Sequence, residues 1–513
     1  MMQNFKYEET LEIDPFYFYL HSLEIVPPFH AYLLDAAYDK QADTRFSRSI
    51  LGLMPLIEVI VKDGKTFIYA KTGLAEWLAQ ELQPNVIEFE GSFVSAVAEK
   101  PCAVFTDNPL EVLERLRLLL RQKIFTENQP IPFSAGFLGY IGYDSVHYLE
   151  KLPKTTLDDR ALPDIRLQLH AFTIHLQVNR LQMFSLLPEL RGYLSKENML
   201  LLESVQMKVL NLLDQGTSEE PRRLKEAAAA SQDTVDIEDE VSAETFMGNV
   251  ERAREYIRAG DIFQVVLSKR MKASATLHPY IAYDRLRKLN PSPYMFMSEY
   301  PDMRLFGASP EVQLRVVDGL AEMKPIAGTS KGRGKSAAED QALAEQLLND
   351  EKERAEHLML VDLCRNDLGR VCTIGSVHVP DFMVVEPYSH LFHLVSTVRG
   401  QLREDVSVFT ALLATFPAGT LSGAPKIRAM EIIDELETLR RGPYGGLLGM
   451  VDLDANANTA IIIRSVVEKN QAYYVQVGAG IVMDSVAEQE WQECNRKAGA
   501  ILDILSQPMA TQK

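Results

Sequence analysis

Two pairs of carboxylates have spacings that place each pair on one side of a helix. Glu353 and Glu356 are three residues apart in EKERAEHLMLVDLCRNDLGR, and Glu490 and Glu493 repeat this spacing in EQEWQECNRK, followed four residues later by Lys497. Residues three or four apart are neighbours on a helix surface. Four carboxylates from two helices suit Mg²⁺, which prefers oxygen ligands and completes its shell with water and an anionic substrate. For either pair alone, a solvated acidic face is the alternative.

Short glycine-rich segments could provide the complementary half of an anion site. Four of them could form turns in which a ligand approaches backbone N–H groups closely. They are PIAGT at 325–329, AGTLSGAPK at 418–426, YGG at 444–446 and GAG at 478–480. Each by itself could be an ordinary turn. In the second segment, Ser422 is expected to be the N-cap of a helix that has Pro425 in its first turn, so that the helix N-terminus could face an anion.

Three single residues could bind or protonate a substrate. Arg464 is the only charge in the apolar run 461–467, where it is costly to bury unless it meets an anion, an ordinary ion pair being the alternative. His393 in SHLFHLVSTVRG has an intrinsic pKa suited to proton transfer near neutrality, although histidines also occur in protein cores. Glu311 follows the Gly-Ala-Ser turn of GASPE and could be a proton donor or a surface carboxylate.

The surrounding sequence predicts an α+β fold. Strands are expected at 56–61 and 66–69, with a meander at 447–452, 460–467 and 472–477, and helices at 109–122, 243–259, 338–364, 404–416, 424–440 and 485–505. Helices and hairpins are segregated rather than alternating, which favours antiparallel sheets. The charged segment 214–242 has few large apolar residues and is predicted to link an N-terminal region, 1–213, to a C-terminal domain, 243–513.

Composition excludes several classes of protein. The 513 residues are 46% hydrophobic and 24% charged, as in a globular protein with a large core. The formal charge of −18 argues against a nucleic acid or an anionic membrane surface as the main partner. The N-terminus lacks the pattern of a signal peptide, and no run of about 18 apolar residues occurs, so we expect a cytoplasmic protein without a membrane span.

Together these features resemble the chorismate-utilising enzymes, and among them the large subunits of anthranilate synthases. The resemblance extends from about 245 to 506, with motifs in family order that include DIFQVVLSKR, NPSPYMF, GASPE, PIAGTSKGRG, SHLFHLVSTVRG, AGTLSGAPKIRAMEII, AIIIRS and VGAGIVMDSV. Before about residue 215 it is limited to segments such as FSAGFLGYIGYD. It implies two roughly orthogonal antiparallel sheets with helices outside. It also implies conversion of chorismate and ammonia to anthranilate and pyruvate with Mg²⁺, the first committed step of tryptophan biosynthesis.

The resemblance implies roles for individual residues. Glu356 and Glu493 match metal ligands, with Glu353 and Glu490 as supporting or alternative ligands. The positions that match catalytic residues are His393, Glu311, Thr420 and Lys497. The positions that match chorismate contacts are Gly328, Thr329, Tyr444, Arg464, Gly478, Ala479 and Gly480.

The resemblance also implies a site for tryptophan as an inhibitor. Its intact part is PSPYMF, with Pro293, Tyr294 and Met295, whereas a segment that usually reads LLES in the family reads LLDA here, with Ala36 in place of the serine. A lost hydroxyl contact predicts weak or absent inhibition by tryptophan.

A partner subunit and three alternatives complete the expectations. No cysteine stands in a glycine-flanked nucleophile turn, so a glutamine amidotransferase subunit is expected to supply ammonia, in a heterotetramer. An aminodeoxychorismate synthase would carry a lysine at Ala327. An aminodeoxyisochorismate synthase would stop before pyruvate is lost. A catalytically silent binding subunit would have no reason to keep both carboxylate pairs and His393.

Overall fold

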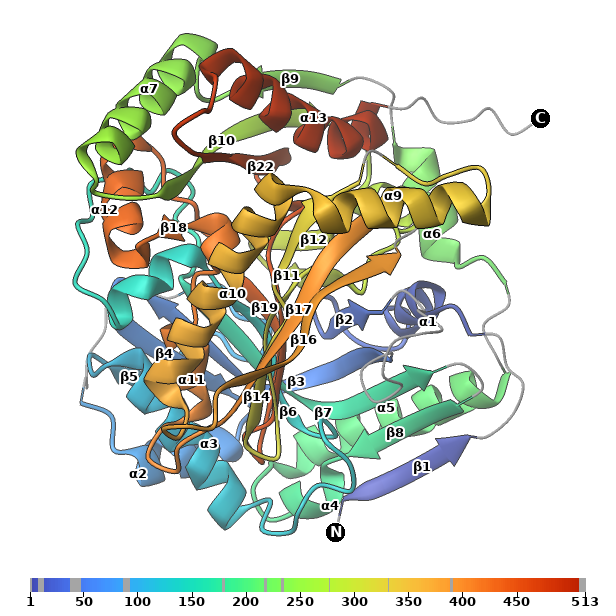
Figure 1. The fold of residues 1–513 in the computed structure, drawn as a ribbon. Coiled ribbons are helices and arrows are strands. Elements are labelled where there is room, and N and C mark those ends of the chain that lie inside the picture. Colours follow the sequence, from blue (N-terminus) through green and yellow to red (C-terminus); the bar gives the residue numbers. More distant parts are fainter. Residues whose placement is uncertain are drawn as a thin grey trace.

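Two antiparallel sheets that share their two longest strands form the frame of the protein (Figure 1). A computed structural model describes residues 2–7, 13–36, 48–85, 93–177, 180–215, 219–231, 235–275, 277–330, 332–387 and 391–506. The shared strands are β3 (Ser49–Lys62) and β7 (Ile165–Gln177), which pair with each other along their length.

The first half of β3 pairs with β2, and its second half pairs with β4. In the same way, the two halves of β7 pair with β6 and β8. The register between β3 and β7 shifts between Pro55 and Ile57, next to Met54, whose φ is 60°. Because such a bulge bends a strand, each half belongs to a different sheet.

The first sheet contains β22, the strand that precedes the C-terminal helix α13. Its spatial order is β9 (Val235–Asp239), β10 (Gln264–Ala275), β22 (Ala472–Ile481), β21 (Ser465–Lys469), β12 (Met303–Ser309), β11 (Tyr294–Tyr300), β2 (Ala31–Asp35), β3, β7, β8 (Arg180–Ser185) and β1 (Gln3–Tyr7). The two-residue strand β18 (Gly423–Ala424) pairs with the start of β10.

The second sheet carries the strands around the PIAGT segment. Its order is β5 (Ala103–Phe105), β4 (Lys65–Ala70), β3, β7, β6 (Gly136–Ile141), β19 (Leu447–Asp452), β20 (Ala457–Ile461), β13 (Val312–Val317), β14 (Leu320–Met323) and β17 (Phe392–Gln401). Two further strands also pair with β17, namely β15 (Ile326–Thr329) and β16 (His378–Pro387).

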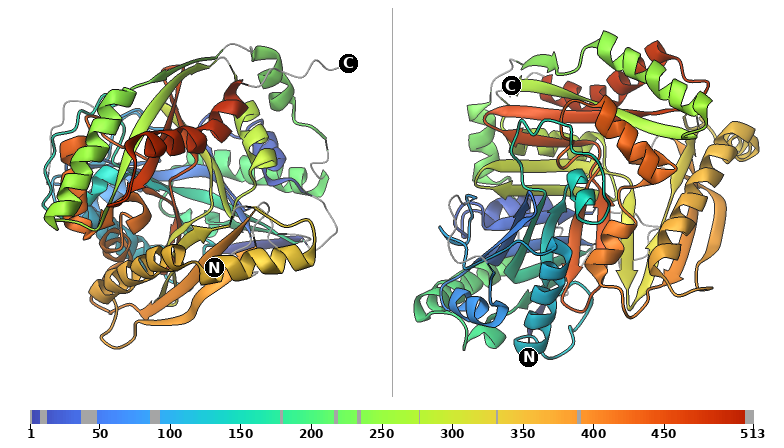
Figure 2. Two further views of the ribbon diagram at one scale, coloured as in Figure 1. Left: turned by 45° about the horizontal axis from the view of Figure 1, so that its top comes forward. Right: turned by 90° about the vertical axis from the view of Figure 1, so that its left-hand side faces the viewer.

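Helices cover the outer faces of the sheets (Figures 1 and 2). They are α1 (Pro15–Ser22), α2 (Leu74–Leu82), α3 (Pro109–Lys123), η1 (Tyr143–Tyr148), α4 (Leu187–Leu190), α5 (Lys196–Gln215), α6 (Arg222–Ala230), α7 (Ala243–Ala259), α8 (Pro279–Leu289), α9 (Ala337–Asn349), α10 (Glu351–Val371), α11 (Val408–Ala414), η2 (Gly419–Leu421), α12 (Lys426–Leu436) and α13 (Ala487–Ser506). Helices α9 and α10 pack on β15, β16 and β17, whereas α13 packs on β22 and α7. The mixed helical and antiparallel fold class is confirmed.

Side chains from both sheets meet in a buried cluster. Tyr140, Phe296, Leu305 and Met450, from four different strands, are members of it. Burial of this kind contributes about 25 cal/mol for each Å² of apolar surface removed from water. This packing fixes the position of the two sheets relative to each other.

Several predicted elements are confirmed, and three boundaries are wrong. The helices at 109–122 and 243–259 match α3 and α7, and Gly260 ends α7 in the left-handed conformation. The single helix predicted at 338–364 is two helices, because Asp350 ends α9 and caps α10. The helix at 404–416 is confined to α11, and the strand at 460–467 is interrupted at Arg464, whose φ is 50°.

The sequence predicts a linker at 214–242 between two regions of the chain, and both regions contribute strands to these sheets. Within 214–242, the predicted linker, the structure describes α6 and β9, and β9 pairs with β10. Strand pairs β2–β11 and β6–β19 join the region 1–213 to the region 243–513. The two regions therefore share both sheets, and the division stays a prediction about the sequence.

Candidate active site

The carboxylates of α10 and α13 face each other. Asp350 caps α10 by accepting hydrogen bonds from the backbone N–H groups of Lys352 (3.0 Å) and Glu353 (3.1 Å), which places the Glu353–Glu356 pair in the first turns. Burial raises the pKa of Glu356, and the carboxylates of Glu353 and Glu493 raise it further, against the opposing effect of Lys352. The effect of the Glu493 charge on the pKa of Glu356 indicates that the two predicted pairs lie near each other.

Lys497 connects these carboxylates to the sheet. Its Nζ lies 2.8 Å from Oε1 of Glu493 and donates a hydrogen bond of 2.9 Å to the carbonyl of Gly478 on β22. Burial raises the pKa of Glu490, and so does the nearby carboxylate of Glu493. The acidic cluster thus lies over the GAG segment.

The cluster fits a hard cation in donor type and in charge. Among the described residues, no three His, Cys, Asp or Glu side chains converge closely enough to hold an ion. The carboxylates are paired with lysines instead, Glu356 with Lys352 at 3.7 Å and Glu493 with Lys497. Burial is the main cause of the raised pKa values of Glu356 and Glu490, and the smaller contribution of neighbouring carboxylates is one that a divalent cation would offset.

His357 was not predicted, and it fixes the position of α10. It is fully buried, with Nδ1 3.2 Å from the carbonyl of Ala327 and Nε2 2.7 Å from Oγ of Ser396. Its only sequence signal is its place directly after Glu356, which turns it toward the sheet when Glu356 faces α13.

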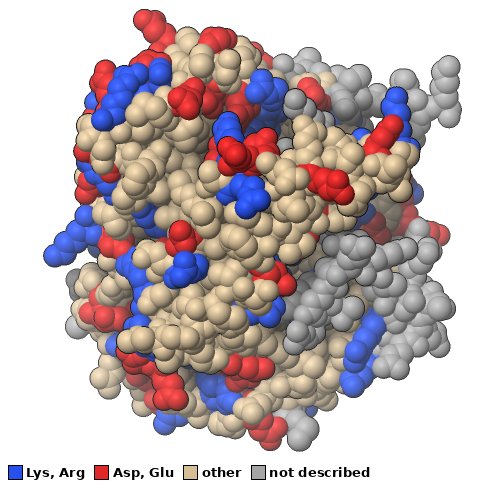
Figure 3. Space-filling view, in the orientation of Figure 1, with Lys and Arg blue, Asp and Glu red and all other residues tan. Residues whose placement is uncertain are grey.

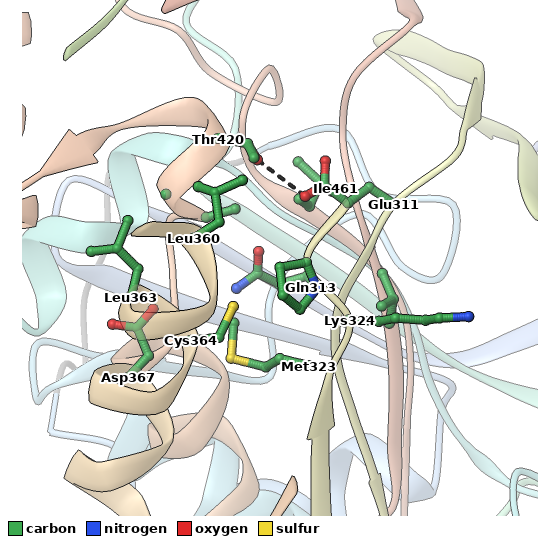
Figure 4. Close-up of a pocket in the computed structure, with 14 residues that line it drawn as sticks. Glu311, Gln313, Met323, Lys324, Leu360, Leu363, Cys364, Asp367, Thr420 and Ile461 are labelled. Carbon is green, nitrogen blue, oxygen red and sulfur yellow. Dashed lines mark hydrogen bonds between the residues drawn. The ribbon is translucent and has the colours of Figure 1, made fainter. Parts of the chain in front are cut away.

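Glu311 and Thr420 form a hydrogen-bonded pair beside these helices (Figure 4). The Oγ1 of Thr420, on η2, donates to Oε1 of Glu311 at 3.2 Å, and the carbonyl of Glu311 accepts from the N–H of Ile461 at 3.0 Å. Burial raises the pKa of Glu311 to about 7, although Thr420 and Arg464 lower it. A carboxyl with this pKa can donate a proton near neutral pH.

His393 lies opposite the PIAGT strand. It pairs with Thr329 across β17 and β15, and its Nδ1 lies 3.2 Å from the carbonyl of Gly328. Burial lowers the pKa of His393, and Arg464 lowers it further. The contact with a carbonyl places a proton on Nδ1, so Nε2 of the neutral ring is the proton acceptor.

Arg464 occupies a break between two strands rather than the interior of one. Its carbonyl accepts from the N–H of Ala308 at 3.1 Å, and its side chain is exposed. Its charge affects the pKa values of both Glu311 and His393, so the guanidinium is close to both. The positive charge of Arg464 therefore lies near Glu311 and His393, although the backbone there is not the expected strand, and its contact with an anion stays a prediction.

The PIAGT and GAG segments are strands, not the expected turns. A Cβ at Gly478 of β22 would lie 2.8 Å from Oη of Tyr444 and 2.9 Å from the carbonyl of Leu267. Gly328 of β15 has φ 83°, and a Cβ there would lie 3.4 Å from Oε2 of Glu353. Gly478 favours glycine because a side chain would collide with Tyr444 and with the neighbouring strand β10, and Gly328 favours it because of its positive φ.

The other predicted substrate residues lie along the same strands. Gly480 is on the same side of β22 as Gly478, and the side chain of Ala479 between them is fully buried, so only its backbone could contact a ligand. Tyr444 is buried, and burial raises the pKa of its hydroxyl.

The expected N-cap at Ser422 is wrong. Ser422 is fully buried, and its Oγ donates to the carbonyl of Ala418 at 2.9 Å. Pro425 is the residue before α12, and no side chain caps that helix. The AGTLSGAPK segment instead forms η2 and β18, which present Thr420 to Glu311.

The two segments of the predicted tryptophan site lie side by side. Met295 of β11 pairs with Asp35 of β2, and a pocket beside them is lined by Ala36, Pro293, Tyr294 and Met295. Asp35 is buried, and its carboxylate accepts hydrogen bonds from Ser49 (3.0 Å) and Tyr283 (3.3 Å). Binding of tryptophan there stays a prediction.

A mixed helical and antiparallel fold that places buried titratable side chains next to acidic helices is typical of an enzyme. The chain belongs to the chorismate binding enzyme family, whose family model matches residues 76–503. It is 42% identical over 415 residues to "Anthranilate synthase component 1" of Acetivibrio thermocellus, covering 78% of this chain and 80% of the relative. The match crosses the boundary expected at 214–242.

Solved structures agree with this assignment. Anthranilate synthase component I from Streptococcus pneumoniae TIGR4 has a TM-score of 0.72 and 34% identity, covering 90% of this chain and 93% of that one. The menaquinone-specific isochorismate synthase from Escherichia coli has a TM-score of 0.66 over 99% of this chain and 94% of that one, and at 16% identity it shows a shared fold alone.

The charge on one face of the molecule is mixed. On the face that carries α9 and α10, acidic and basic side chains are interspersed among uncharged ones (Figure 3). No helix of the described residues has the length and apolar character needed to cross a membrane.

Proposed function

We propose that this chain is the chorismate-converting subunit of an anthranilate synthase, which forms anthranilate and pyruvate from chorismate and ammonia. The observation that carries the proposal is Glu311, whose pKa of about 7 and hydrogen bond to Thr420 suit a proton donor. The 42% identity to an anthranilate synthase component 1 over most of the chain supports the choice of reaction.

The carboxylates of α10 and α13 would hold Mg²⁺, with Glu356 and Glu493 as ligands and Glu353 and Glu490 supporting them. When bound, Mg²⁺ would neutralise a substrate carboxylate and withdraw electrons from the ring. Arg464 and the backbone N–H groups of the PIAGT and GAG strands would bind the other carboxylate. A dicarboxylate can then approach a chain of charge −18.

The proton transfers follow from the two pKa shifts. Ammonia adds at C2 of the ring while the bond from C4 to its hydroxyl breaks, and Glu311 gives its proton to that hydroxyl, which leaves as water. The neutral His393 is the better acceptor for the C2 proton in the second step, when pyruvate is eliminated. Lys497 would help to neutralise the metal end of the site.

Ala327 favours direct attack by ammonia over covalent catalysis. Its side chain has no amine, and its carbonyl contacts His357 instead. An aminodeoxychorismate synthase with a lysine nucleophile at this position is therefore disfavoured. The identity to anthranilate synthases argues against an enzyme that stops at aminodeoxyisochorismate and against a silent subunit.

We also propose that a glutamine amidotransferase subunit supplies ammonia, in a heterotetramer that acts in the cytoplasm in tryptophan biosynthesis. The name component 1, which the relatives carry, supports a partner subunit. Whether tryptophan inhibits depends on the pocket beside Ala36.

The proposal is tested by mixing the purified chain with chorismate, ammonium chloride and Mg²⁺ and following anthranilate fluorescence. We expect fluorescence that requires all three components and disappears with a chelator. Consumption of chorismate without an aromatic amine as product would contradict it.

A further inference from the structure

A narrow pocket lies beside the Glu311–Thr420 pair, where residues 360–367 of α10 form one of its walls (Figure 4). Its walls come from β13, β14, η2 and α10, and Met323, Leu360 and Leu363 make much of its lining apolar. Figure 4 shows Glu311 and Thr420 at one end, Cys364 and Asp367 at the other, and Gln313 between them. The proposed proton transfers use Glu311 at its end but give the rest of this pocket no role.

Gln313 presents an unsatisfied acceptor to the pocket. Its side chain is 1% exposed, and its Nε2 donates to the carbonyl of Thr415 at 2.8 Å. That bond fixes the orientation of the carboxamide, because a carbonyl accepts only from the amide nitrogen. Oε1 has no hydrogen-bond partner among the residues that the structure describes. A buried acceptor without a partner is costly, so a small donor is expected beside it.

The opposite end of the pocket carries no net charge. Asp367 and Lys426 are both buried, and Nζ of Lys426 donates to Oδ2 of Asp367 at 2.6 Å. Burial raises the pKa of the Cys364 thiol, which therefore stays neutral. A neutral donor such as water suits this environment better than a cation.

We propose that the pocket holds a water molecule that donates to Oε1 of Gln313 and returns a proton to Glu311 after each turnover. The space is sufficient for a water molecule. The inference rests on the proposed function, in which Glu311 loses its proton to the leaving C4 hydroxyl. The carboxylate of Glu311 takes a proton from the pocket water, which regains one from solvent, and solvent has received the proton that the added ammonia loses.

The charged groups around Glu311 come from several elements. Arg464 lies between β20 and β21, and Lys324, between β14 and β15, is paired with Glu386 at 2.8 Å. Asp367 on α10 and Lys426 on α12 form the buried pair. Gln313 is uncharged, and its Oε1 has no hydrogen-bond partner among the described residues. It is therefore the residue that would position the water, and the one to replace.

The experiment replaces Gln313 by Met, which keeps the volume but removes the acceptor, and by Glu, which keeps an acceptor oxygen. We expect Gln313→Met to lower kcat about tenfold or more, to increase the solvent deuterium isotope effect on kcat, and to leave KM for chorismate and ammonium unchanged. Gln313→Glu should recover most of kcat and move the alkaline limb of the pH profile upward. Met323→Leu, in the apolar wall, is the matched control and should behave as the wild type.

Unchanged kcat and isotope effect in Gln313→Met would overturn the inference. A raised KM for ammonium alone would also overturn it, because the pocket would then admit ammonia rather than relay protons.

A spectroscopic readout separates failure of this inference from failure of the proposed function. The infrared band of the protonated Glu311 carboxyl, assigned with Glu311→Gln, is followed against pH in the wild type and in both Gln313 variants. We expect a higher midpoint in Gln313→Met, since the carboxylate loses the water that stabilises its charge. An unchanged midpoint in a wild type that makes anthranilate would refute the pocket water. A shifted midpoint in a chain that makes no anthranilate would refute the proposed function alone.

Discussion

Glu311 holds a proton because burial opposes its charge more strongly than Thr420 and Arg464 favour it. A general acid must be protonated to act, so activity should fall as the pH rises through about 7. Glu311→Gln should lower kcat at least about 100-fold and remove that alkaline limb, as measured by kcat against pH. Loss of activity without any change in the limb would assign the titration to another group.

The same shift predicts a pH-dependent change in stability. The pKa of Glu311 is raised from 4.5 to about 7 on folding, so its contribution is present below pH 4.5 and is lost as the pH rises through about 7. At pH 8, Glu311→Gln should therefore exceed the wild type in unfolding free energy by up to about 3 kcal/mol and unfold at a higher temperature, with little difference at pH 4. Thermal unfolding at the two pH values measures this.

Residue type and spacing were sufficient to place the two carboxylate pairs on helices and to select Glu311 as a candidate, whereas their roles came from the family resemblance. Gln313 and His357 were not predictable in this way, since their roles come from complete burial and from a partner on another element. Arg464 was expected inside a strand, and only its positive φ shows the break that presents it.

At the scale of elements, α10 and α13 carry opposing carboxylates. Glu356→Gln should cost at least about 100-fold in activity and abolish thermal stabilisation by Mg²⁺, while raising the unfolding temperature without metal, since it removes a repelling charge. Glu351→Gln, an exposed residue on the same helix, is the control. Equal Mg²⁺-dependent stabilisation in both variants would refute the metal assignment.

The predicted tryptophan site depends on the pairing of β2 with β11, which brings its two segments together. Because Asp35 already accepts from Ser49 and Tyr283, it is a poor substitute for the missing serine at position 36. Tryptophan should inhibit weakly, and Ala36→Ser should increase its affinity about 5-fold or more, measured by titration of the rate. Micromolar inhibition of the unmodified chain would show that Ala36 is not the controlling difference.

Element boundaries were predictable where a capping residue and an apolar periodicity coincide, as at Ser242 and Gly260 around α7. The boundary predictions were wrong where one residue ends one helix and begins the next. Asp350 ends α9 and caps α10, and a helical pattern that continues on both sides conceals this break.

At the scale of the whole molecule, the site depends on strands from distant parts of the chain. The register between β2 and β11, and between β6 and β19, joins residues about 260 to 316 positions apart, for example Met295 with Asp35 and Tyr140 with Leu448. Periodicity within a segment says nothing about such pairing, so the sheet order followed only from the family resemblance and the structure.

The partner prediction also belongs to this scale. The described cysteines are buried or partly buried, and burial raises the pKa of Cys364 and of Cys494, which makes them poor nucleophiles. The chain alone should therefore use ammonium but not glutamine, and an added glutamine amidotransferase subunit should confer glutamine dependence. Glutamine-dependent anthranilate formation by the purified chain alone would contradict this.

The central claim is that one chain carries out both amination and pyruvate elimination. The most direct test is to measure anthranilate by fluorescence and pyruvate by a coupled assay in the same reaction with chorismate, ammonium chloride and Mg²⁺. We expect equal rates of formation of the two products, both abolished in Glu311→Gln. Chorismate consumed to an aminated product without pyruvate, or pyruvate released without ammonium, would contradict it.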